Sequence, residues 1–177
     1  MIKFLIVGEN SIDKKEIVNM LLSNEGMFKI AKYFSTNEEE SKQDFYYYLS
    51  NQELHICYKN HAILFVKTTL CDSVGITLEE FYENNVIFMN TEDFNNISNR
   101  VFLSNNELII VWLDTKNHDT NQIKKEIKES SYLQEKIDTD NLKYLYFLDK
   151  PTIEIMDVIC EYLKKPELRE ELLENYS

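Results

Sequence analysis

The chain has 177 residues, of which 44% are hydrophobic and 12% aromatic, and this composition is typical of one folded globular domain and excludes a disordered chain. Its formal net charge of −12, from 19 Lys and Arg against 31 Asp and Glu, disfavours binding to nucleic acid or to an anionic membrane surface. The opening run MIKFLIVG is too short to span a membrane and lacks a signal-peptide cleavage site, so we expect a cytoplasmic protein.

Hydrophobic patterning predicts strands that alternate with helices along the chain. The predicted strands are 2–7, 28–34, 61–69, 86–89, 108–113 and 144–148. The predicted helices are 13–23, 77–84, 119–129, 131–137 and 152–164, with a short last helix within 166–177. Thr77 and Glu80 have the spacing of a capping box, which would begin the second of these helices. This alternation predicts an α/β fold with a mostly parallel sheet and helices on both faces.

The cysteines and histidines give no metal-binding spacing. Cys57, Cys71 and Cys160 are odd in number and widely separated, which argues against a disulfide framework. His55 and Cys57 alternate in a segment that we interpret as a strand, with His61 nearby. Ordinary core and surface roles are favoured over ligation, so no metal site is predicted.

The loop after the first strand has the layout of a phosphate-binding loop. That pattern is glycine, four residues, glycine, lysine and then serine or threonine. Gly8 and Lys14 stand where the pattern requires them, but Asp13 replaces the second glycine and Lys15 replaces the hydroxyl that holds magnesium. The candidate cofactor-binding residues are Gly8, Asn10, Ser11, Lys14 and Lys15. From these residues alone, a generic strand–turn–helix with a surface lysine remains an equal alternative. The start also resembles receiver domains of signalling proteins, but these need an acidic pair after the first strand, and Gly8-Glu9 supplies only half of it.

The order of the later segments carries further information. Ser35-Thr36-Asn37 follows the second strand, FYYYLSNQEL follows it in turn, and Val74–Thr77 forms a turn within AILFVKTTLCDSVGITLEEFYEN. VIFMNTEDF, LIIVWLDTKNHDTNQIKKEI and YLYFLDKPTIEIMDVICEYL complete the order. Along most of its length the chain resembles bacterial and phage guanylate kinases, in the nucleoside-monophosphate kinase group of P-loop proteins.

The resemblance implies a single three-layer domain over 1–177, with an acceptor-lobe-like insertion at about 35–82 and a lid-like segment at about 116–140. It implies that Lys14 would act in catalysis and that Ser35, Thr36 and Thr77 would bind the acceptor nucleotide. An active member would use ATP with magnesium. No nucleic acid and no membrane is expected as a partner.

Several positions depart from the family pattern. Asn37 stands where the family has an arginine, and VIFMN lacks the aspartate that lies near magnesium. The lid segment NQIKKEIKESSYLQEKID contains lysines but no arginine, and lysine lacks the planar fork that grips phosphate. Losing one preorganised donor typically costs about 10²–10³ in rate, so losing several predicts little phosphoryl transfer.

Three functions therefore stay open. The first is a degenerate kinase-like domain that binds a nucleotide weakly, or a protein partner through the aromatic run Phe45–Tyr48. The second is an active nucleoside-monophosphate kinase with unusual loops. The third is an acidic inhibitor that covers a basic partner, which the charge of −12 and the run Glu38–Glu40 suggest.

Overall fold

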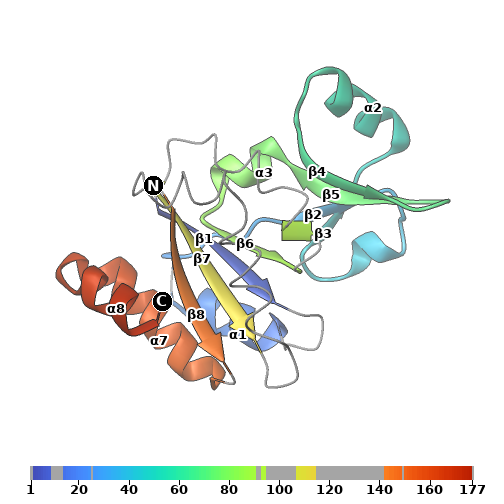
Figure 1. Cartoon of the computed structure of the whole chain (residues 1–177). Helices are drawn as coiled ribbons and strands as arrows, with labels where there is room; N and C mark the ends of the chain where they lie inside the picture. The colour runs from blue at the N-terminus through green and yellow to red at the C-terminus, as the bar shows by residue number, and fades with distance from the viewer. Residues whose placement is uncertain are drawn as a thin grey trace.

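A computed structural model describes residues 2–8, 14–24, 26–90, 93–94, 107–114, 142–148 and 150–176 (Figure 1). Within these ranges the chain forms two four-stranded sheets. The predicted helices 119–129 and 131–137 and the lid-like segment 116–140 lie outside the described residues.

The first sheet is entirely parallel and confirms the fold class expected from the sequence. Its order is β6 (Val86–Met89), β1 (Ile2–Gly8), β7 (Glu107–Asp114) and β8 (Leu142–Leu148). Phe4–Val7, Val86–Met89 and Leu108–Leu113 are buried apolar residues at consecutive positions, because both faces of the sheet are covered here. Every strand points the same way, so the carboxyl ends of β1, β6 and β7 lie together at one edge.

Helices cover one face of this sheet. They are α1 (Lys14–Ser23), α7 (Thr152–Lys164) and, after the short turn η2 (Pro166–Leu168), α8 (Arg169–Tyr176). Figure 1 shows α7 and α8 beside β8. Alternate residues of the strands pack beneath these helices, as Phe4 and Ile6 do against Ile17 and Ile159.

The opposite face is covered by α3 (Leu78–Glu83) and by strands of the second sheet. Leu5, Val7, Ile110 and Trp112 pack there with Phe81 of α3. Lys3 also points to this face: it is 0% exposed, and its ammonium donates hydrogen bonds to the carbonyls of Phe81, Tyr82 and Asn84, at and just after the end of α3. The buried cation thereby pairs with the carbonyls that the helix leaves open.

The second sheet has the order β3 (Tyr46–Tyr48), β2 (Tyr33–Ser35), β5 (Ser73–Thr77) and β4 (Ile63–Thr68). All pairs are antiparallel except β2 with β3, and the turn η1 (Glu40–Lys42) precedes β3. Helix α2 (Asn51–Lys59) packs Leu54 on this sheet, away from the parallel sheet (Figure 1). Gly75 allows close contact within it, because a Cβ there would lie 2.1 Å from the Phe65 carbonyl oxygen.

The predicted strand through His55 and Cys57 is wrong, because both residues lie in α2. Ser50 and Glu53 form a reciprocal capping box at its start. At its end the amide of His61, with φ +53°, donates to the Tyr58 carbonyl, and the amide of Ala62 donates to the Cys57 carbonyl. This pair of bonds is a Schellman ending, so local signals on both sides determine a helix.

Three other sequence predictions need correction. The turn expected at Val74–Thr77 is wrong, because these residues lie in β5. Between 28 and 34 only Ile30 pairs with the parallel sheet, as an isolated bridge to Val86, and β2 begins at Tyr33. The Thr77 side chain does cap α3, accepting from the Glu80 amide at 3.3 Å. The Glu80 carboxylate, however, accepts from the Lys32 amide at 2.8 Å, so only half of the expected capping box forms.

Two segments connect the sheets, and they are tied to each other. The side chain of Asn85 accepts from the Lys29 amide at 2.7 Å and donates to the Met27 carbonyl at 3.0 Å. The Ala31 amide donates to the Val86 carbonyl at 2.9 Å. The segment that leaves the parallel sheet therefore lies along the segment that returns to it.

Candidate ligand-binding cavity

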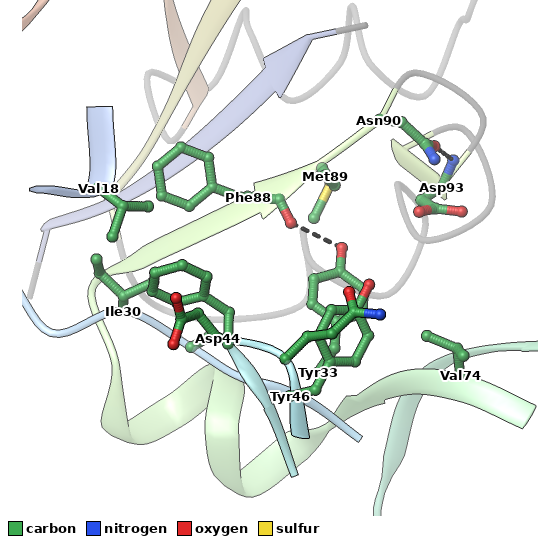
Figure 2. A pocket seen from close by; sticks show the side chains of 13 residues that line it. Val18, Ile30, Tyr33, Asp44, Tyr46, Val74, Phe88, Met89, Asn90 and Asp93 are labelled. Atoms are coloured by element: carbon green, nitrogen blue, oxygen red, sulfur yellow. Dashed lines mark hydrogen bonds between the residues drawn. The ribbon is translucent and has the colours of Figure 1, made fainter. Parts of the chain in front are cut away.

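A cavity of about 430 Å³ lies between the two sheets, at the carboxyl end of β6 (Figure 2). One side is formed by Phe88, Met89 and Asn90 at the end of the parallel strand. The other side comes from β2, β5 and the segment that leads into β3. Its place agrees with the general rule that parallel sheets bind ligands beyond the carboxyl ends of their strands.

Two neighbouring phenol rings form one wall of the cavity. The rings of Tyr33 and Tyr46 lie 5.9 Å apart between centroids and are tilted by 39°. The Tyr33 hydroxyl donates a 2.7 Å hydrogen bond to the carbonyl of Phe88, the bond drawn in Figure 2. Burial, followed by the negative charge of Asp93, raises the pKa of Tyr33 well above its usual value. Both effects favour the neutral phenol, so the bond to Phe88 is present at neutral pH.

Burial also raises the pKa of Tyr46, with smaller contributions from the charges of Glu40 and Asp93. The wall is therefore an uncharged aromatic surface at neutral pH. Such a surface suits a flat ring, because aromatic groups stack favourably in offset or tilted arrangements.

A third aromatic residue is held at the cavity by an uncommon backbone conformation. Phe45 has a φ of +73°, which bulky residues rarely adopt and which costs about 1–3 kcal/mol. Its carbonyl accepts from the Tyr33 amide at 2.8 Å, and its ring packs on the core of the parallel sheet. These contacts fix the direction in which Phe45 meets the cavity.

Polar groups lie at the end of the cavity beyond β6. The Asn90 side chain accepts from the Asp93 amide at 2.7 Å, and the Asn90 carbonyl accepts from the Phe94 amide at 3.0 Å. This turn holds the mostly buried Asp93 at the cavity (Figure 2). Asp44 and Gln43 are exposed and stand at its opening. Carboxylate and amide groups thus line the cavity at this end and at its opening.

The described residues on either side of the predicted phosphate loop form a strand and a helix. Gly8 ends β1 beside Leu113 of β7, and Lys14 and Lys15 are the first two residues of α1. Asn10 and Ser11 lie outside the described residues. The binding roles of these residues, and the catalytic role of Lys14, stay predictions.

The hydroxyls expected to bind the acceptor nucleotide are hydrogen-bonded to other groups of the protein. Ser35 is 0% exposed and donates to the Glu40 carboxylate at 2.7 Å. The Thr36 hydroxyl accepts from the Ser73 amide at 2.8 Å, and the Thr77 hydroxyl caps α3. None of the three lines the cavity among the described residues. Their role in binding a nucleotide stays a prediction.

Asn37, where the resemblance implies an arginine, stabilises a turn. Its side-chain oxygen accepts from the amides of Glu39 and Glu40 at 2.9 and 3.2 Å. Its side-chain nitrogen donates to the Asp72 carboxylate at 3.2 Å. The side chain therefore shapes the loop before η1.

The aromatic run Phe45–Tyr48 is divided among three environments. Phe45 and Tyr46 line the cavity, whereas Tyr47 packs edge-on against Phe34 beneath α2, and Tyr48 is 51% exposed. An interface made of the whole run is therefore not available on one surface. Partner binding through Tyr48 stays a prediction.

Sequence reasoning missed Tyr33 and Asp93 as cavity residues. Tyr33 is one of 11 tyrosines, and nothing in the sequence around it distinguishes it from a tyrosine that merely begins a strand. Asp93 follows a buried strand by four residues, and the spacing of Asn90 and Asp93 is typical of a turn in which the asparagine side chain accepts the later amide. That pattern after VIFM is the signal that could have identified Asp93.

Among the described residues, no group of three or more His, Cys, Asp or Glu side chains is placed to hold a metal ion, and the three cysteines are free thiols. None of the described helices combines the length and the apolar character that crossing a bilayer requires.

No family model matches the sequence, and no curated protein matches it. Solved structures do match. The crystal structure of guanylate kinase from Anaplasma phagocytophilum is similar with a TM-score of 0.52, covering 94% of this chain and 86% of that chain. The fold is guanylate kinase-like. The sequence identity is 11%, so the likeness concerns the fold and not the individual residues.

The match covers 94% of this chain, so it includes most of both sheets. It agrees with the fold expected from the order of segments.

Proposed function

We propose that this protein is a guanylate kinase-like domain that binds a nucleotide or its nucleoside part in the cavity and does not transfer a phosphoryl group. The observation that carries the proposal is the cavity between the sheets, with the neighbouring rings of Tyr33 and Tyr46 as its wall. The fold, which a known guanylate kinase shares, supports the nucleotide as ligand class.

The size and chemistry of the cavity support this ligand class. About 430 Å³ lies within the range of sites for small molecules, which are mostly apolar with a few placed polar groups. Stacking of a nucleobase on an aromatic side chain contributes about 1–3 kcal/mol. Asn90 and Asp93 line the same cavity as Tyr46 and supply polar groups beside its aromatic wall.

The absence of phosphoryl transfer is proposed from the residues that replace the catalytic groups. Asp13 places a carboxylate where backbone should approach phosphate, and Lys15 removes a magnesium ligand. Asn37 and Asn90 stand where the family has an arginine and an aspartate, and both side chains are used to hold local turns. Lys14 is the remaining cation of the loop pattern.

Calorimetric titration with guanosine, GMP, GTP and ATP, each with and without magnesium, tests the binding. We expect that at least one nucleobase ligand binds and that Tyr46→Ala weakens it about tenfold or more, because the stacking surface is lost. Tyr48→Ala is the matched control, since Tyr48 lies on the same strand but is exposed outside the cavity. Equal weakening by both variants, or no binding to folded protein, would contradict the proposal.

A coupled assay for ADP formation from ATP and GMP tests the second part. We expect no turnover above a blank without protein. Turnover that disappears in Lys14→Ala would show an active nucleoside-monophosphate kinase and would overturn the claim of inactivity.

A further inference from the structure

Phe45 stands at a position of its turn where glycine is the usual residue. Of the described residues other than glycine, two have a positive φ, Phe45 at +73° and His61 at +53°. His61 follows the end of α2, where this conformation is common. Phe45 is instead the third residue of a turn in which the Tyr46 amide donates to the Gln43 carbonyl at 3.3 Å. A positive φ at the third position of a turn favours glycine, because a side chain there is strained. The phenylalanine therefore needs contacts that offset its strain.

Two contacts hold this turn. The Phe45 carbonyl accepts from the Tyr33 amide at 2.8 Å, which attaches the turn to β2. The Phe45 ring is half-buried, lines the cavity and packs on the core that includes Val18 of α1 and Phe88 of β6. The backbone of Phe45 is thus bonded to the second sheet while its side chain is anchored on the first.

The anchored turn leads directly into the wall of the cavity. Tyr46 is the first residue of β3, which has three residues and pairs with β2 at the edge of the second sheet. A strand with so few ladder bonds opens easily by itself. Tyr46 nevertheless stands opposite Tyr33, with the ring centroids 5.9 Å apart (Figure 2). The place of the Tyr46 ring therefore depends on the residue before it.

We propose that Phe45 is a positioning residue for this wall: its ring anchors a strained turn so that the Tyr46 ring stands beside Tyr33 before a planar base binds. A surface that is already in place loses less freedom on binding, and this raises affinity. Phe45 thus acts on the ligand through Tyr46. The inference rests on the proposed function and names the residue that prepares the same cavity for its ligand.

The first test uses the full chain without a ligand. Nuclear Overhauser contacts between the ring protons of Tyr33 and Tyr46 report whether the wall is in place. We expect these contacts in the wild type and in Phe45→Leu, which keeps an apolar anchor, and their loss in Phe45→Gly, which removes the anchor and the strain together. His61→Gly is the matched control, because it makes the same kind of change at the other positive φ, on a residue outside the described lining of the cavity. It should keep the contacts.

The second test measures affinity by calorimetry, with whichever of guanosine, GMP, GTP and ATP binds the wild type most tightly. We expect Phe45→Gly to weaken binding about tenfold, as loss of a preformed surface would, and Phe45→Leu and His61→Gly to weaken it much less. Adding Phe45→Gly to Tyr46→Ala should change the affinity by no more than about twofold, because the residue through which Phe45 acts is already gone. Thermal unfolding checks that each variant is folded.

The outcomes separate this inference from the proposed function. Ring contacts that persist in Phe45→Gly would overturn the inference whether or not a ligand binds. Losses of affinity that add in the double variant would also overturn it, because Phe45 would then act independently of Tyr46, and the proposed function would stand. Failure of all four ligands to bind folded wild-type protein would overturn both.

Discussion

The hydroxyl of Tyr33 and the carbonyl of Phe88 are joined by a 2.7 Å hydrogen bond that crosses from the second sheet to the parallel sheet. The bond lies at the cavity and connects β2 with the edge strand β6. It is a polar contact beside apolar side chains such as Ala31 and Met89, which pack in the same boundary.

Tyr33→Phe removes this bond and keeps the ring. We expect the free energy of unfolding to fall by about 1 kcal/mol, the usual net contribution of one hydrogen bond, as measured by urea denaturation. Tyr46→Phe is the control, because its half-buried hydroxyl has no hydrogen-bond partner among the described residues and its loss should cost less. Equal losses in the two variants would show that the bond does not stabilise the fold.

His61→Gly is expected to stabilise the protein. His61 has a φ of +53° at the Schellman ending of α2, and its side chain is exposed, so glycine removes backbone strain with little loss of packing. We expect a gain of about 0.5–1 kcal/mol in urea denaturation. Asn60→Gly, at the neighbouring position with φ −89°, should instead destabilise because glycine adds freedom to the unfolded chain. A gain in both variants would contradict this account.

Gly75→Ala should be strongly destabilising. A Cβ at this position would lie 2.1 Å from the Phe65 carbonyl oxygen and 2.8 Å from the Phe34 ring, so backbone must move. We expect a loss of about 3 kcal/mol or more, at the upper end of overpacking costs. Gly26→Ala offers a comparison, because its Cβ would meet nothing within 4 Å and only its φ of +72° opposes alanine. A smaller loss at Gly75 than at Gly26 would refute the steric argument.

Lys3 should make stability depend on alkaline pH. Burial lowers the pKa of its ammonium to about 8, from 10.5 when unfolded. Between these values the folded protein has released the proton while the unfolded chain keeps it, so stability contributed by this group rises with pH, by at most about 1.4 kcal/mol per unit. Below pH 8 both states are charged and the contribution is flat.

The measurement is urea denaturation of wild type and Lys3→Met at pH 7 to 10. Met removes the amine that bonds the carbonyls of Phe81, Tyr82 and Asn84, so the variant should be less stable throughout. The decisive quantity is the difference between the two proteins, which should widen above pH 8. Subtraction removes the opposite trend of the buried tyrosines, whose raised pKa values, such as that of Tyr33, make stability fall at high pH. A constant difference would contradict the lowered pKa.

The parallel sheet was predictable because its signals are local. VIFM and LIIVWL are short, rich in β-branched residues and apolar at consecutive positions, as is typical of a strand covered on both faces, and both are strands of the first sheet. The helix α7 was predictable from its apolar periodicity. Alternation misled the prediction at His55 and Cys57, because a spacing of two residues is too short to outweigh capping signals at Ser50 and His61.

The cavity was not predictable in the same way. Its walls come from Tyr33, Tyr46, Phe88 and Asp93, which are remote in sequence and meet only through the packing of one sheet on another. The residues that the family resemblance selected, such as Ser35 and Thr36, make hydrogen bonds within the protein instead. A spacing rule cannot distinguish a hydroxyl that is offered to a ligand from one that holds a turn.

The tie between the two connecting segments has a consequence for the history of this fold. The chain leaves the parallel sheet near Lys29 and returns at Asn85, and these residues are hydrogen-bonded neighbours. The segment between Lys29 and Asn85, which carries the second sheet, therefore begins and ends at neighbouring positions. Such a piece can be lengthened, shortened or exchanged without rethreading β1 and β6. The side of the cavity that the second sheet forms can thus change in evolution while the parallel sheet stays as it is.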